Sequence, residues 1–373
     1  MTTPSDFLPG ALVTLAIDTL AFGGEGIGRH EGRAVFVPFT APGDVAEVRV
    51  RDVKKNFARA ELVRVVTPGP HRTAAPCPYY GTCGGCQYQH LDPEEELRVK
   101  ESQVGEALRR VGKIASPPVL PIIRSPQVYG YRNRITVHAA HGKVGFHRAG
   151  SRELVDIGHC LLAVPEVNEE LATLRRGSKP QEGHFSLRAP GVPPSAFHQV
   201  NGLLLEPLRE LVTAWTRGAG AETRLVEGYC GGGFFTGALA GAFEKVWAIE
   251  SDGRALRDAR RLPAKNVQWI EGRVEEFLTG ALTEAADGPV VVLVDPPREG
   301  LAPGAVAALR QRPPARIVYV SCDPATLARD LAALGANSAD GLYVLERNQP
   351  FDMFPRTAQI ETVTTLRRAE AAR

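Results

Sequence analysis

The alternation of apolar and polar residues changes character along the chain. Up to about residue 66, short alternating runs are separated by Gly and Pro turns, which is typical of a small OB-like β-barrel. After residue 195, apolar strand-like runs alternate with helical stretches, and this pattern predicts βαβ units with a parallel sheet. The strand candidates are "TRLVEGY", "KVWAIES", "NVQWIEG", "PVVVLVDPP" and "RIVYVSC".

The region between these two patterns is mixed. It opens with the proline-rich linker "TPGPHRTAAP" and continues into a cysteine-rich loop. A helix is predicted over 93–111, because Asp92 can cap it, Pro93 suits its first position and acidic residues occupy its first turn. Short strands and loops are expected from there to about residue 194. We therefore predict three domains, over 1–66, 67–195 and 196–373, with helix 93–111 packed on the third.

Composition favours a globular protein of the cytosol. Of the 373 residues, 43% are hydrophobic and 23% are charged, and no apolar run has the length of a membrane span. The start "MTTPSDFLPG" lacks the basic and apolar regions of a secretion signal, so we expect a cytoplasmic protein with reduced cysteines. The net charge is only +2, but the stretch from Leu120 to Arg152 has no acid. The stretch contains six basic residues, which either bind a polyanion or form an ordinary solvated surface. They are Arg124, Arg132, Arg134, Lys143, Arg148 and Arg152.

The predicted sheet has the features of a nucleotide-binding edge. Gly231, Gly232 and Gly233 form a turn between a strand and a helix, and the next strand ends at Glu250, where an acid commonly binds ribose hydroxyls. A dinucleotide-dependent oxidoreductase shares these features. The strand that ends at Asp295 is followed by two prolines, which stiffen the chain beside the site. Such a rigid wall suits a planar substrate next to S-adenosylmethionine, so a methyltransferase is favoured over a dehydrogenase.

Four of the six cysteines form a candidate metal centre. "CPYYGTCGGCQ" spaces three of them as C-x5-C-x2-C, and Cys160 is a plausible fourth ligand. Four thiolates can hold zinc or an iron–sulfur cluster. Zinc ribbons usually contain two C-x2-C pairs, so three clustered ligands and one remote ligand favour a cluster. The C-x3-C-x2-C spacing of radical enzymes that use S-adenosylmethionine is absent. The other three ligands are Cys77, Cys83 and Cys86.

A fifth cysteine lies where an open α/β sheet binds its ligands. Cys322 follows the apolar run "IVYVS", and Asp323-Pro324 then starts a helix. Its thiol is therefore either a nucleophile or part of the packing. Cys230, in the glycine turn, is the rival nucleophile, but it lies beside the expected cofactor, so we interpret it as a packing residue.

Several motifs occur together and in a fixed order. They are "CPYYGTCGGCQYQHL", "YRNR", "FHQVN", "DPPREGL", "SCDPATLARDL" and "DMFPRTAQIETV". Together they resemble the uracil-5-methyltransferase family of RNA-modifying enzymes, over essentially the whole chain. The resemblance is closest to the branch with an N-terminal TRAM domain and a four-cysteine iron–sulfur cluster. It implies an α/β fold: a C-terminal Rossmann-like class I methyltransferase domain, an OB-like TRAM barrel and a central mixed β domain that carries the cluster.

The resemblance also assigns roles to individual residues. Cys322 matches the family's nucleophile and Glu361 its general base; without the motif, Glu361 would equally be a solvent-facing residue of a terminal strand. The implied cofactors are S-adenosylmethionine and a 4Fe-4S cluster. Residues at the family's S-adenosylmethionine contacts are Gln199, Tyr229, Glu250 and Asp295, and those at the cluster ligands are Cys77, Cys83, Cys86 and Cys160. This chain departs from the commonest pattern at Glu227, Phe234 and Asp323.

The implied reaction is methylation of C5 of a uridine in RNA through a covalent Cys–C6 adduct. The partner is RNA, with 23S ribosomal RNA expected and transfer RNA as the alternative; we expect no membrane association and no obligate protein partner, hence a monomer. Arg132 and Arg134 are candidate phosphate contacts, with pairing to carboxylates as the alternative. A non-catalytic RNA-binding protein would not need both Cys322 and Glu361. A cytosine-5 DNA methyltransferase normally places its cysteine after a proline, which "SCDP" does not match.

Overall fold

The chain divides into two compact units that are each discontinuous in sequence. The computed structural model describes residues 7–177, 182–192, 199–218, 223–336 and 341–369. We call the two units unit 1 and unit 2, and describe each by itself. Unit 1 comprises residues 1–100, 127–190 and 354–359, and unit 2 comprises 101–126, 191–353 and 360–373.

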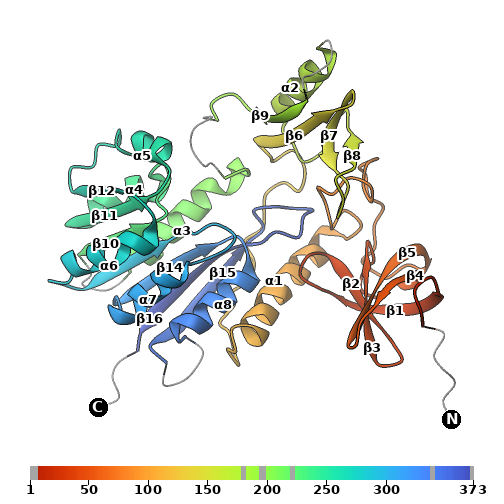
Figure 1. The fold of residues 1–373 in the computed structure, drawn as a ribbon, viewed down its shortest axis with the longest axis horizontal. Coiled ribbons are helices and arrows are strands. Elements are labelled where there is room, and N and C mark those ends of the chain that lie inside the picture. Colours follow the sequence, from red (N-terminus) through yellow and green to blue (C-terminus); the bar gives the residue numbers. More distant parts are fainter. Residues whose placement is uncertain (1–6, 178–181, 193–198, 219–222, 337–340, 370–373) are drawn as a thin grey trace. The chain divides into compact units, whose positions relative to one another are not determined.

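Unit 1 begins with a closed five-stranded barrel, drawn in red and orange in Figure 1. Buried and exposed residues alternate along its strands, and the apolar core inside includes Leu15, Ile17, Val35 and Val48. This confirms the predicted OB-like barrel. Its spatial order is β1-β2-β3-β5-β4, with strands β1 (Leu12–Leu20), β2 (Glu25–His30), β3 (Arg33–Pro38), β4 (Val45–Val53) and β5 (Phe57–Thr67).

The second part of unit 1 is a four-stranded antiparallel sheet with one helix. The order is β8-β7-β6-β9, and helix α2 (Pro165–Arg176) packs on one face, as Figure 1 shows. The strands are β6 (Arg134–Ala140), β7 (Lys143–His147), β8 (Leu154–Asp156) and β9 (Gly183–Arg188).

Unit 2 contains a seven-stranded sheet in the order β12-β11-β10-β13-β14-β16-β15. The five predicted strands are confirmed: they pair in parallel and form β10 (Arg224–Gly228), β11 (Lys245–Glu250), β12 (Val267–Glu271), β13 (Val290–Val294) and β14 (Arg316–Ser321). Two antiparallel strands, β15 (Tyr343–Phe351) and β16 (Glu361–Arg368), extend the sheet beyond β14. The strand order reverses between β10 and β13, which is where such sheets bind ligands.

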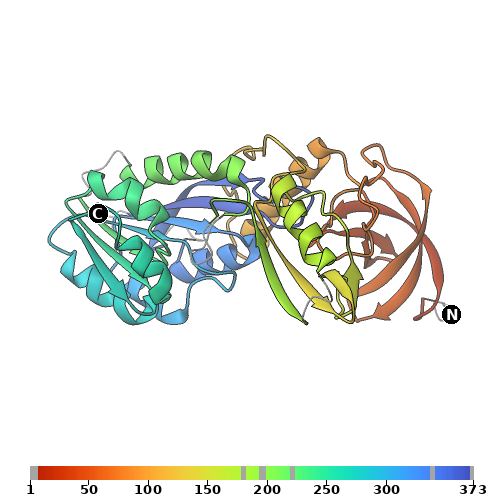
Figure 2. The same ribbon diagram turned by 90° about the horizontal axis from the view of Figure 1, so that it is seen from above.

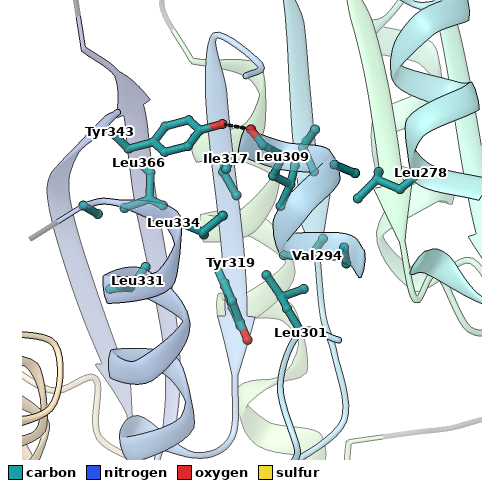
Figure 3. Packing of buried hydrophobic residues seen from close by; sticks show 14 of the residues in the cluster. Leu278, Val294, Leu301, Leu309, Ile317, Tyr319, Leu331, Leu334, Tyr343 and Leu366 are labelled. Atoms are coloured by element: carbon teal, nitrogen blue, oxygen red, sulfur yellow. Dashed lines mark hydrogen bonds between the residues drawn. The ribbon is translucent and has the colours of Figure 1, made fainter. Parts of the chain in front are cut away.

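Helices lie on both faces of this sheet (Figure 2). The core includes Ile317, Tyr319, Leu331 and Leu366, and the Tyr343 hydroxyl donates a hydrogen bond to the Leu309 carbonyl at 2.7 Å (Figure 3). None of the helices within the described ranges has the length and apolar character needed to cross a bilayer. The helices are α1 (Pro93–Arg110), which begins in unit 1 and ends in unit 2, α3 (Leu205–Arg217), α4 (Phe234–Leu239), α5 (Gly253–Ala259), α6 (Val274–Glu284), α7 (Pro303–Gln311) and α8 (Pro324–Leu334), with 3-10 turns η1 (Gly202–Leu204) and η2 (Ala240–Ala242).

Candidate active site

Three of the four predicted cofactor residues lie at the carboxyl ends of neighbouring strands in the seven-stranded sheet. Tyr229 follows β10, Glu250 ends β11 and Asp295 follows β13, and these strands are neighbours in the order β11-β10-β13. The Gly231 backbone N–H donates to the Glu250 carboxylate at 2.9 Å, which ties the glycine turn to the adjacent strand. Gln199 is buried and lies just before η1, while the Phe and His of the "FHQVN" motif lie outside the described residues.

The turn after β10 has an unusual backbone. Tyr229 has a φ of 62°, and Gly233 has a φ of 80° at the N-cap of α4. At this positive φ any other residue would be strained, and a Cβ at Gly233 would lie 2.6 Å from Leu262 Cδ1, so the turn favours glycine there. Beneath the turn, buried Glu227 accepts a hydrogen bond from Thr236 Oγ1 at 2.6 Å, and burial raises its pKa to about 8. A protonated Glu227 therefore ties α4 to β10.

A cavity of about 720 Å³ adjoins this edge. It is lined by Tyr229 and Ser251 from the strand ends, and by Arg273, Leu301 and Asp330 from the start of α6, the loop after β13 and α8. This volume lies within the range of small-molecule and cofactor sites in proteins.

The strand register places Cys322 opposite Glu361. In the antiparallel β14–β16 ladder Ser321 pairs with Thr362, so the next step beyond β14 brings Cys322 to the position across from Glu361. Thr362 Oγ1 donates to the Ser321 carbonyl at 3.2 Å, which fixes this end of the ladder. Glu361 is buried, whereas Cys322 is only partly buried. Two residues 39 positions apart in sequence (361 − 322) are thus brought together by strand pairing.

The backbone after Cys322 is held by a helix cap. The Asp323 carboxylate accepts hydrogen bonds from the backbone N–H groups of Ala325 and Thr326 at 3.0 and 2.9 Å. Pro324 occupies the first helical turn of α8. These features fix the position at which the strand becomes a helix, and therefore the position of the thiol.

The groups around Cys322 interact electrostatically. The pKa of Cys322 is raised to about 11, mainly by burial and also by the charges of Glu361 and Asp295, while Arg298 opposes the rise through its charge and a hydrogen bond. Burial, then the charge of Asp295, also raises the pKa of Glu361 well above its usual range. Sequence reasoning missed Arg298. Its place in the "DPPREGL" motif, three residues after Asp295, was the available signal.

The four predicted cluster cysteines line one cavity in unit 1. Its volume is about 280 Å³, all four residues are free thiols, and Arg132 also lines it. Burial raises the pKa of the Cys86 thiol to about 12, and that of Cys160 also lies above its usual value. Within the described ranges, no group of three or more His, Cys, Asp or Glu residues could hold a single metal ion.

Cysteine thiolates are the usual ligands of iron–sulfur clusters, so the four cysteines that line this cavity are the set of donors that such a cluster would need.

Residues 354–359 form a segment, which we call the strap, that connects β15 to β16 but belongs to unit 1. Buried Arg356 donates to the Glu96 carboxylate at 3.2 Å and to the Leu91 carbonyl at 2.9 Å. Lys100 donates to the same carboxylate at 2.7 Å. Thr357 and Gln359 of the strap line the four-cysteine cavity. Glu96 and Lys100 are four residues apart on α1, but no local sequence pattern indicated that Arg356 binds beside them.

Comparison with known proteins identifies the family. Residues 7–63 match the TRAM domain family, and residues 192–369 match the family described as tRNA (Uracil-5-)-methyltransferase. An uncharacterized RNA methyltransferase of Bdellovibrio bacteriovorus is 33% identical over 96% of both chains. The tRNA (uracil(54)-C(5))-methyltransferase of Schizosaccharomyces pombe is 29% identical over 95% of this chain and 78% of that protein.

A solved structure has the same fold. The Pyrococcus abyssi tRNA (uracil-54, C5)-methyltransferase, crystallised with S-adenosyl-L-homocysteine, superposes with a TM-score of 0.66 at 24% identity, over 95% of this chain and all of that one. This likeness confirms the predicted fold class, with a Rossmann-like domain and an N-terminal barrel. The chain belongs to the RNA (uracil-5-)-methyltransferase family, in the group that carries an N-terminal TRAM domain.

Proposed function

We propose that this protein transfers a methyl group from S-adenosylmethionine to C5 of a uridine in RNA, giving 5-methyluridine. The observation that carries the proposal is that Cys322 and Glu361 flank the last pair of the β14–β16 ladder and interact electrostatically. This pair supplies a nucleophile and a base in one place, next to the sheet edge that ends in Asp295 and Tyr229. Uracil methylation at C5 requires both groups.

The Cys322 thiolate adds to C6 of a uracil that has been flipped out of its stack, which places electron density on C5. S-adenosylmethionine, when bound, supplies the methyl group as an electrophilic sulfonium. After transfer, C5 carries both a methyl group and a proton. Glu361 removes that proton, the C5–C6 double bond re-forms and the thiolate of Cys322 leaves. Arg298 stabilises the anionic sulfur at the start and end of the cycle.

Forming the Cys322 thiolate costs less free energy than the positioning of the reactants can contribute. A pKa of about 11 corresponds to roughly 5 kcal/mol for forming the thiolate at pH 7. Holding the reactants in an attack geometry can contribute about 7–11 kcal/mol. The fixed position of Cys322 between β14 and the Asp323 cap therefore matters more than its acidity.

Four residues are proposed to bind S-adenosylmethionine. The Glu250 carboxylate already accepts hydrogen bonds from the backbone N–H groups of Gly231 and Asp252, at 2.9 and 2.6 Å, and its exposed edge suits ribose hydroxyls. Tyr229 lines the adjoining cavity. Asp295 and Gln199 complete the set. The S-adenosyl-L-homocysteine named with the Pyrococcus abyssi structure supports this choice of cofactor.

The four cysteines are proposed to hold a 4Fe-4S cluster. Cys77, Cys83, Cys86 and Cys160 would supply one thiolate each around the cavity that they line. Methyl transfer requires no change of oxidation state, so such a cluster would brace unit 1. Reduced thiols of this kind fit the cytoplasm, where we propose that the enzyme acts.

The RNA that carries the target uridine is either ribosomal RNA or transfer RNA. The sequence resemblance favours 23S ribosomal RNA. Transfer RNA is the second candidate, because the relatives from Schizosaccharomyces pombe and Pyrococcus abyssi are both named for uracil 54 of tRNA. Mass mapping of 5-methyluridine in rRNA and tRNA from cells that lack the protein distinguishes the two.

The proposed function is tested by trapping the covalent adduct. RNA that carries 5-fluorouridine has no removable proton at C5, so the adduct should accumulate with the wild-type protein and be absent with C322A. C230A is the matched control and should retain the adduct. An adduct in C322A, or release of no tritium from uridine labelled at C5 by the wild-type protein, would refute the assignment.

A further inference from the structure

The four-stranded sheet of unit 1 has one covered face and one open face. Every second residue of β6, including Ile135, Val137 and Ala139, packs in a core with Val167 and Leu171 of α2. The intervening residues of β6 therefore point to the opposite face, because side chains alternate along a strand. That open face carries Arg134, Thr136 and His138 from β6, Arg188 and His184 from β9, and His147 from β7.

Two arginines form a like-charged cross-strand pair on this face. Arg134 is directly opposite Arg188 in the β6–β9 register. Desolvation, and then the charge of Arg188, lower the pKa of Arg134. Within the described part of the chain neither guanidinium forms an ion pair. Arg188 Nη1 donates to the Ser186 carbonyl at 3.3 Å, whereas Arg188 Nε is buried without a hydrogen-bond partner. Like charges placed directly opposite one another destabilise a sheet, so an anion bound between the two guanidiniums would reduce their electrostatic repulsion.

Three histidine rings lie on the same face, roughly 13 Å from the arginine pair along the strands, beyond the Thr136–Ser186 pair. His138 is directly opposite His184 with ring centroids 4.4 Å apart, and His147 lies 4.1 Å from His138. His184 is exposed, and β9 is an edge strand of the sheet. Exposed rings on a sheet provide flat surfaces on which unpaired bases can stack.

Two of the acidic residues around the sheet are paired with arginines. Asp156 on β8 is bound by Arg175 of α2, and Glu153 pairs with Arg148. Glu182 lies 3.6 Å from His141 at the end of the sheet, and the Glu170 carboxylate accepts from the Arg188 backbone N–H at 2.6 Å. The net character of the open face is therefore cationic.

We propose that the open face of the β8-β7-β6-β9 sheet is a docking surface for single-stranded RNA. Arg134 and Arg188 bind backbone phosphate, and His184, roughly 13 Å farther along the sheet, stacks on an unpaired base of the same strand of RNA. This surface shares no residue with the set proposed for methyl transfer, so it holds a part of the RNA other than the target uridine. The inference rests on the proposed function only in taking RNA as the ligand. Charge complementarity and the clustered, exposed histidine rings favour RNA over a protein partner, which would leave the two neighbouring guanidiniums desolvated.

The test measures RNA binding by the full-length protein without a methyl donor. The probe is a fluorescein-labelled, uridine-containing single-stranded RNA of about 20 nucleotides. Its anisotropy gives Kd at pH 8 across a KCl series. Each phosphate contact contributes about 0.7 to the slope of log Kd against log salt, so R134Q/R188Q should lower the slope by about 1.4. The same loss corresponds to roughly a tenfold weaker Kd at physiological salt.

Three further variants separate the contributions. R110Q/R209Q removes the same two charges from exposed helical positions and should leave the slope unchanged. R134K/R188K keeps the charges and should retain the slope. H184A should weaken Kd about fivefold or more with the slope unaltered, because it removes a stacking surface and not a cation. If R134Q/R188Q fails to fold, the Kd of H184A tests the docking surface on its own.

Wild-type Kd and slope in a folded R134Q/R188Q protein, together with wild-type Kd in H184A, would overturn the docking surface. That result would leave the adduct with 5-fluorouridine RNA untouched. Conversely, loss of RNA affinity in these variants stands even if no 5-methyluridine is formed, so the two proposals fail separately.

Discussion

Ser321 and Thr362 are hydrogen-bonded neighbours in the β14–β16 ladder, and this pairing sets the position of the two groups proposed for catalysis. Because the strands are antiparallel, the residue after Ser321 and the residue before Thr362 face each other. A shift of one residue in this register would turn Glu361 to the other face of the sheet. The hydrogen bond from Thr362 to the Ser321 carbonyl therefore helps to hold the strand register on which the geometry of the site depends.

Glu361→Gln should separate adduct formation from product release. The glutamine cannot accept the C5 proton, so the methylated adduct should persist and turnover should fall by about 10²-fold or more. Rapid-quench gels would show protein–RNA adduct accumulating on ordinary uridine RNA. E346Q, an exposed glutamate on β15, is the control. Release at the wild-type rate in E361Q would remove Glu361 from the mechanism.

The rate should rise with pH. The Cys322 thiol, with a pKa of about 11, reacts as the thiolate, so each pH unit below that value should increase kcat/KM up to tenfold. Arg298→Gln removes a cation that lowers this pKa and should reduce kcat/KM about tenfold at neutral pH. Arg298→Lys retains the charge and should restore much of the rate. A pH profile that is flat, or identical in R298Q and wild type, would contradict this role.

Glu227→Gln should stabilise unit 2 at alkaline pH. The pKa of Glu227 is raised to about 8 in the folded protein, so its favourable contribution is complete below the ordinary value of 4.5 and is lost as pH rises through 8. Each pH unit in that window costs about 1.4 kcal/mol. The introduced glutamine is neutral at every pH, and its amide oxygen can still accept from Thr236. Urea midpoints at pH 5 and pH 8 should differ less in E227Q than in wild type or in E244Q, an exposed control.

Arg356→Ala should destabilise unit 1 strongly. Removing the Arg356 guanidinium leaves the buried Leu91 carbonyl and one oxygen of the Glu96 carboxylate without that donor, and costs about 3–5 kcal/mol. R209A, which breaks an exposed pair with Glu206, should cost less than about 1 kcal/mol. Chemical unfolding compares the two variants. Equal midpoints would mean that the strap does not stabilise unit 1.

The sequence predicted the regular parts of the fold because apolar periodicity is strong there. All five parallel strands and the barrel could be recognised in this way. Strand β15 could not, because its residues include Glu346, Arg347 and Pro350, which an edge strand tolerates and an apolar pattern does not reveal.

The candidate site depended more on resemblance than on pattern. Cys322 could be suspected from its place at a strand end, but Glu361 needed the motif, since alternation alone fits a solvent-facing glutamate. The contact of Arg356 with Glu96 joins residues 260 positions apart, and no local signal encodes such a pair. The cross-strand pairing of Arg134 with Arg188 likewise required the register of the sheet.

Because both units are discontinuous in sequence, a single cut in the gene does not separate them. Val104 and Leu108 of α1 belong to the core of the seven-stranded sheet, and Leu120 and Ile123 hydrogen-bond to β15. A gene segment that begins near residue 191 would therefore encode a sheet without part of its core and one of its edges. The barrel, in contrast, is one uninterrupted stretch with its own interior, so it can be gained or exchanged by simple gene fusion.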